Sequence, residues 1–87
     1  MIFRDFLCMK TLAVLPAGTG TAVEVWQKLP YAFRQRMRPS SVGRILGFPK
    51  YNCLIHMEPQ TRKGRLYRHK EFEKWRKMGH REVRYRY

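Results

Sequence analysis

The clearest strand signal in the chain lies in residues 51–69, which read YNCLIHMEPQTRKGRLYRH. Over residues 51–58, apolar and polar side chains alternate, as they do in a strand with one packed face. Residues 59–64 contain a proline and a glycine and predict a loop, after which residues 65–69 return as a second strand. We therefore expect a β-hairpin that packs against other elements, because an isolated hairpin is only marginally stable.

Short helices are expected on both sides of this hairpin. After it, Phe72, Trp75 and Met78 recur at helical spacing and predict a helix over residues 69–78, with Trp75 as a packing residue. Gly79 is expected to end this helix, and the alternating pattern of the tail, residues 80–87, is typical of an extended segment in a groove.

Three further short helices are predicted before the hairpin. Thr21 and Glu24 match a capping box and favour a helix over residues 21–29, although the β-branched and aromatic residues there favour a strand. Pro30 suits the first position of a second helix, which Pro39 ends. A third, VGRIL, is expected to be capped by one of the two preceding serines, Ser40 or Ser41, and to end at a glycine.

The first twenty residues are expected to form an apolar N-terminal arm and loop. Residues 1–15 have loosely helical apolar spacing, and residues 16–20, PAGTG, predict a loop. The arm is either an organelle-targeting segment or an anchor that docks on a neighbouring protein. We divide the chain into residues 1–20 and a basic body, residues 21–87. The fold class is α+β or irregular: a small extended protein, ordered mainly within an assembly.

Positive charge dominates the composition. The chain has 19 Lys and Arg against 6 Asp and Glu, a formal net charge of +13 on 87 residues. Residues 1–33 contribute only +1, whereas residues 62–87 contribute +8 with aromatic rings between the cations. Such a pattern is typical of proteins that bind nucleic acids, because cations neutralise phosphates and flat rings stack on bases.

We predict RNA as the partner, since the sequence shows no helix-turn-helix, zinc-finger or basic-zipper pattern for DNA. The candidate phosphate contacts are Arg34, Arg36, Arg38, Lys50, Arg62, Lys63, Arg65, Arg68, Lys70, Arg76, Lys77, Arg81, Arg84 and Arg86. The candidate stacking residues are Tyr67, Tyr85 and Tyr87.

Motifs for catalysis are lacking. The carboxylates form no recognisable pair, and the histidines have no nucleophile at a telling spacing, so we expect no enzyme activity, no cofactor and no small-molecule substrate. Cys53 and His56 have the spacing of half a zinc site but fit a strand better, with Cys53 on the packed face and His56 on the other. Cys8 and Cys53 are expected to be reduced, and no apolar run is long enough for a transmembrane span.

In its short length, arginine content, apolar N-terminal stretch and basic C-terminal extension, the chain resembles small mitochondrial ribosomal proteins. The resemblance implies a structural constituent of the ribosome in the mitochondrial matrix, which binds rRNA phosphates and neighbouring ribosomal proteins. The alternative is an accessory subunit of a mitochondrial inner-membrane complex. A third hypothesis is a free nucleic-acid-binding module, which has to fold in isolation.

Overall fold

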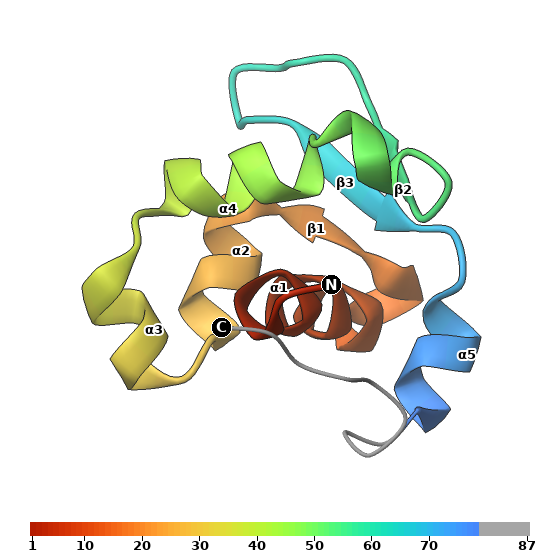
Figure 1. Ribbon diagram of the computed structural model, residues 1–87. Coiled ribbons are helices and arrows are strands. Elements are labelled where there is room, and N and C mark those ends of the chain that lie inside the picture. Colours follow the sequence, from red (N-terminus) through yellow and green to blue (C-terminus); the bar gives the residue numbers. More distant parts are fainter. Residues whose placement is uncertain (79–87) are drawn as a thin grey trace.

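Helix α1 (Phe3–Val14) lies at the centre of the computed structural model, which describes residues 1–78 (Figure 1). Phe6, Met9 and Leu12, spaced by three residues, are fully buried along it. The helix ends at Val14, because Leu15 is extended, as residues before a proline are. A 3₁₀ turn (Pro16–Gly18) follows, in which Gly18 has φ 62° and packs directly against Phe72.

The predicted capping box is confirmed at the start of α2 (Ala22–Lys28). The Thr21 hydroxyl accepts a hydrogen bond from the Glu24 amide (3.2 Å), and the Glu24 carboxylate accepts one from the Thr21 amide (3.1 Å). These two bonds satisfy backbone donors that a helix start leaves free, which explains why helix prevails over the strand alternative.

Two further helices follow, α3 (Tyr31–Arg36) and α4 (Pro39–Leu46). Pro30, which we predicted as the first helical residue of α3, occupies the cap position instead, and the helix begins at Tyr31. Pro39 does not end α3, which stops at Arg36; it is the first residue of α4, where its missing N–H costs nothing. The expected serine cap is therefore wrong, because Arg38 takes the cap position and both serines lie inside the first turn. Gly47 ends α4 as expected.

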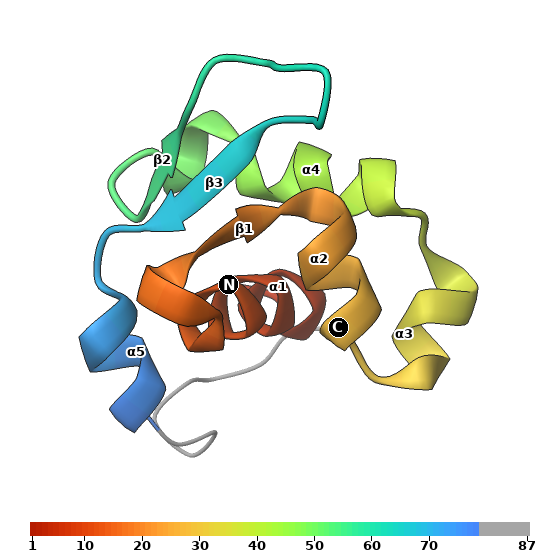
Figure 2. The same ribbon diagram turned by 180° about the vertical axis from the view of Figure 1, so that it is seen from behind.

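The sheet has three antiparallel strands, β1 (Thr19–Thr21), β2 (Ile55–Met57) and β3 (Leu66–His69), with β3 in the middle (Figure 2). The predicted hairpin of β2 and β3 is confirmed, with Ile55 opposite His69. Its first strand is shorter than expected, because a 3₁₀ turn (Pro49–Tyr51) and a tight turn occupy residues 49–54. Cys53 consequently lies exposed in that turn, so its predicted place on the packed face is wrong.

Strand β1 was not predicted. Its first two residues lie in the predicted loop, residues 16–20, and its third is Thr21, the predicted start of the next helix. It pairs with the distant β3, with Gly20 opposite Tyr67. The sheet therefore joins the beginning of the chain to the hairpin.

The last described helix is α5 (Phe72–Lys77), which packs against α1. It is shorter than the predicted 69–78, because His69 belongs to β3 and Met78 is extended. Trp75 is buried against Phe6 and His69, which confirms its packing role.

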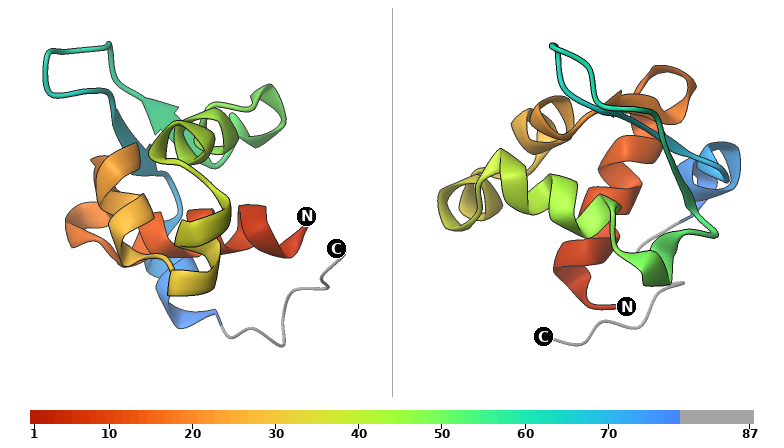
Figure 3. Two further views of the ribbon diagram at one scale, coloured as in Figure 1. Left: turned by 90° about the vertical axis from the view of Figure 1, so that its left-hand side faces the viewer. Right: turned by 90° about the horizontal axis from the view of Figure 1, so that it is seen from above.

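Residues 1–20 and the rest of the described chain share one core. Helix α1 contacts α2, α4, α5 and β3, and lies between α4 and α5 (Figure 3, left). Seven of the sixteen buried apolar side chains among residues 1–78 come from residues 6–15. The apolar stretch is thus the centre of the fold rather than a separate arm. No helix within residues 1–78 combines the length and apolarity needed to cross a membrane.

Candidate nucleic-acid interface

Helix α4 has one side in the core and one side in solvent. Its core side carries three side chains that are at most 2 % exposed, Val42, Ile45 and Leu46. Ser40 and Arg44, four residues apart and therefore neighbours on the helix surface, are exposed. Gly43 and Gly47 add no side chains. The solvent-facing surface of α4 is therefore low, in the sense that its side chains are short or absent, and Arg44 is its one long side chain.

A hollow of about 430 Å³ lies on one side of α4, and we call it the hairpin-side hollow. It is bounded by the first half of α4, the start of α2 and the loop that joins β2 to β3, residues 58–65. Lys63 and Arg65 line it together with the hydroxyl-bearing residues Thr21, Ser40 and Tyr67. The hollow can therefore offer both cations and hydrogen-bond donors to an anion.

The tip of the 58–65 loop is held by its own backbone. Thr61 and Gly64 exchange two backbone hydrogen bonds (3.1 and 3.0 Å), and the Thr61 hydroxyl donates a third to the Gly64 carbonyl (2.7 Å). Gly64 has φ 102°, a conformation that side chains disfavour. This turn leaves Arg62 and Lys63 exposed at the tip.

A second hollow, of about 390 Å³, lies between α3 and α4, and we call it the α3-side hollow. Three arginines line it, Arg34, Arg36 and Arg38. The indole N–H of Trp26 donates to the Met37 carbonyl (2.7 Å) and so fixes the segment between the two helices. Pro39 lines both hollows, so they meet at the N-terminus of α4, which has no side-chain cap.

Several predicted phosphate contacts are occupied within the fold instead. Arg76 donates to the carbonyls of Ala13 (2.7 Å) and Leu15 (2.5 Å) at the end of α1. Lys70 donates to the Asn52 carbonyl (3.0 Å), and Lys50 lies 4.0 Å from the carboxylate of Asp5. Sequence cannot distinguish these cations from free ones, because their partners are distant in the chain.

The remaining predicted cations do not form one surface. Arg36, Arg38, Lys63 and Arg65 line the two hollows beside α4, and Arg34 lies with them over the Tyr31 ring (5.7 Å). Arg62 is exposed at the tip of the 58–65 loop. Arg68 is exposed on β3. Lys77 is exposed on α5, which lies on the opposite side of α1 from α4 (Figure 3, left).

The predicted stacking role of Tyr67 does not fit its position. Tyr67 is only 8 % exposed, because alternate residues of β3 face the core, and its hydroxyl donates to the Gly43 carbonyl (3.4 Å). The other two stacking candidates, Tyr85 and Tyr87, lie outside the described residues. So do Arg81, Arg84 and Arg86.

Arg44 is the functional candidate that sequence reasoning missed. It is a single cation in a weakly charged stretch, so charge density did not single it out. The helical spacing of Val42, Ile45 and Leu46 would have placed it on the opposite, solvent-facing side.

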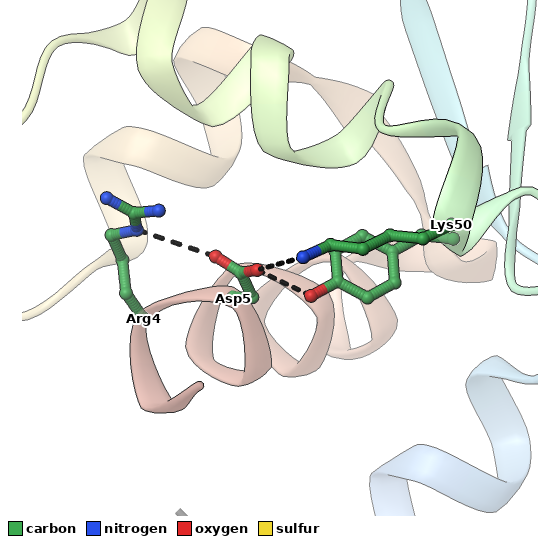
Figure 4. Close-up of polar contacts among 4 residues, drawn as sticks. Arg4, Asp5 and Lys50 are labelled. Atoms are coloured by element: carbon green, nitrogen blue, oxygen red, sulfur yellow. Dashed lines mark hydrogen bonds and ion pairs between the residues drawn. The ribbon is translucent and has the colours of Figure 1, made fainter. Parts of the chain in front are cut away.

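A second group of ionisable side chains surrounds Asp5, which is 1 % exposed (Figure 4). The Tyr51 hydroxyl donates to its carboxylate (2.5 Å), and the Arg4 guanidinium lies at 3.4 Å. Burial, together with the charge of Asp5, raises the pKa of the nearby Cys8 thiol to about 12. Burial and the Asp5 hydrogen bond likewise raise the pKa of Tyr51 far above its usual value. Because both pKa values are raised, neither side chain is an ionised nucleophile near neutral pH. The contacts of Asp5 join α1 to the turn before β2.

No three histidine, cysteine, aspartate or glutamate side chains among residues 1–78 come together as metal ligands.

Compared with known proteins, the chain matches no protein-family model, no curated protein and no solved structure.

Proposed function

We propose that the protein binds double-stranded DNA by placing α4 in the major groove. The observation that carries this proposal is the low outward surface of α4 with a basic hollow on each side. A helix with side chains is about 10–12 Å wide, and the major groove of B-form DNA, about 12 Å wide, admits one.

The arrangement of the helices supports this docking mode by fold-level analogy. Helices α2 and α4 pack against each other with α3 in their connection, and the β2–β3 hairpin follows (Figure 1). This order resembles a helix-turn-helix extended by a β-hairpin, the combination called a winged helix. In helix-turn-helix proteins the second helix of the pair enters the major groove, a role that falls here to α4.

The charges around α4 suit the two phosphate backbones that border a major groove. Arg36 and Arg38 lie on one side, and Lys63 and Arg65 lie on the other. If these four cations each neutralise one phosphate, a plot of the logarithm of the association constant against the logarithm of the salt concentration has a slope of about −4.

A ribosomal role, in mitochondria, is a second proposal, supported by the arginine-rich composition and the net charge of +13. It assigns the same cations to rRNA phosphates. The two proposals differ in the ligand, because the major groove of A-form RNA is too deep and narrow for a helix. An accessory subunit of an inner-membrane complex would need neither ligand.

Binding of the full-length protein to labelled duplexes tests the proposal. We would compare a DNA duplex of about 20 base pairs with the RNA duplex of the same sequence, between about 50 and 200 mM salt. The expected result is tighter binding to DNA. Tighter binding to RNA, with RNase-sensitive sedimentation alongside ribosomal subunits, would favour the ribosomal proposal instead.

Paired charge variants locate the surface. Arg38→Gln with Lys63→Gln removes one cation from each side of α4, and the salt slope should become shallower by about 2. Lys74→Gln with Lys77→Gln removes the same charge from α5 and should leave the slope unchanged. An equal loss in both variants would show that net charge, and not the α4 surface, binds the DNA.

A further inference from the structure

We propose that Arg44 is the residue of α4 that contacts bases, and that its ligand is the major-groove edge of a guanine. This inference rests on the proposed binding of DNA. It adds a preference for one base, supplied by one side chain.

Arg44 has an unoccupied guanidinium. Within residues 1–78 its side chain makes no hydrogen bond, ion pair or ring contact, and it is exposed. Arg76, in contrast, is held by two backbone carbonyls. The guanidinium of Arg44 can therefore bind a ligand without breaking a polar contact with residues 1–78.

No other side chain on the solvent-facing side of α4 reaches as far from the helix as that of Arg44. Ser40 has a short side chain, so it does not reach as far from the helix. Gly43 and Gly47 have no side chains, and a Cβ would be tightly placed at both positions, 3.3 Å from the Tyr67 hydroxyl at Gly43 and 3.2 Å from the Gly43 carbonyl at Gly47. Among the outward residues of α4, only Arg44 is thus long enough to reach the floor of a groove.

The chemistry of the guanidinium selects the base. Its planar fork donates two parallel hydrogen bonds, and guanine presents two acceptors, O6 and N7, on its major-groove edge. A bidentate contact of this kind discriminates against a wrong base by about 5-fold to about 150-fold. Because α4 offers one such contact, we expect a preference for guanine rather than recognition of a long sequence.

The test uses two DNA duplexes that differ by one atom in each guanine. In the second duplex every guanine is replaced by 7-deazaguanine, which keeps base pairing and charge but lacks the N7 acceptor. The full-length protein should bind this duplex at least about 5-fold more weakly. Arg44→Ala should bind both duplexes equally, while circular dichroism shows an unchanged fold because Arg44 is exposed.

Arg36→Ala is the matched control, because it removes the same charge from the rim of the α3-side hollow. It should weaken binding to both duplexes and keep the difference between them. Equal binding of the unmodified protein to both duplexes, or a difference that survives Arg44→Ala, would overturn the role of Arg44 and leave the DNA proposal intact. Failure to bind either duplex would overturn both.

Discussion

Protonation of His69 should destabilise the protein as the pH falls below neutral. The imidazole is fully buried at the end of β3, with its ring 4.8 Å from that of Trp75. Its Nδ1 accepts a hydrogen bond from the Glu71 amide (3.0 Å), so the neutral ring is the form that the fold accommodates. Burial lowers the pKa of His69 from 6.5 to about 4, against the opposing effect of the Glu71 carboxylate.

The size and sign of the effect follow from this pKa. The unfolded chain takes up the proton near pH 6.5, and the folded protein does so only near pH 4, so low pH favours the unfolded state. The free energy of unfolding is then unaffected above pH 7.5 and falls by about 2 kcal/mol on going to pH 5. The full loss, reached below pH 4, is about 3 kcal/mol, a large fraction of the stability of a small domain.

Urea unfolding of the full-length protein between pH 7.5 and pH 5 measures this loss. His69→Asn keeps an acceptor for the Glu71 amide and cannot titrate, so its stability should be lower overall but nearly constant over this range. His56→Gln, which removes a more exposed histidine, should retain the pH dependence. The reasoning fails if His69→Asn loses stability with pH as steeply as the unmodified protein.

Three further substitutions test the packing. Tyr51→Phe leaves the buried Asp5 carboxylate without its hydroxyl donor, so urea unfolding should show a loss of about 2 kcal/mol; a loss below about 0.5 kcal/mol would contradict this. Arg76→Met removes two hydrogen bonds to the end of α1 and should cost about 1–2 kcal/mol in the same assay, whereas Lys77→Met should not. Gly18→Ala combines a positive φ with a Cβ 2.5 Å from a neighbouring side chain, so thermal unfolding should show a loss of more than about 1 kcal/mol; an unchanged midpoint would refute the clash.

Local signals in the sequence predicted the local elements well. The capping box of α2 lies within four residues, and the alternation and loop chemistry of residues 51–69 indicated the hairpin. Strand β1 could not be found this way, because three residues with a central glycine become a strand only through pairing with β3. The role of residues 1–15 was equally hidden, since Asp5 is satisfied by Tyr51, 46 positions away.

The candidate site was predictable in kind but not in detail. Composition indicated a polyanion, and the loop cations Arg62 and Lys63 are exposed as that role requires. Arg76 looks the same in the sequence, yet it is held by the end of α1. Which cations are free depends on which carbonyls the fold brings near them, and the sequence does not contain that information locally.

Two of the cations stabilise the packing of α1 against α5. Arg76 of α5 donates to carbonyls at the end of α1, and Lys10 of α1 donates to the carbonyls of Trp75, Arg76 and Met78 at the end of α5. Helix C-termini carry partial negative charge, so each helix supplies a cation that stabilises the end of the other.

Among residues 1–78, the cations around α4 donate to no helix-end carbonyls of this kind, and their mutual repulsion destabilises the compact state. The unfolded chain also attracts a polyanion through its net charge of +13, but only the folded chain gathers cations around α4. A polyanion that binds this surface more tightly than it binds the unfolded chain should raise the unfolding temperature by more than salt alone does. The Arg38→Gln, Lys63→Gln protein should have less repulsion to relieve and show a smaller ligand-induced rise. A rise of the same size in both proteins would place the bound polyanion elsewhere on the surface.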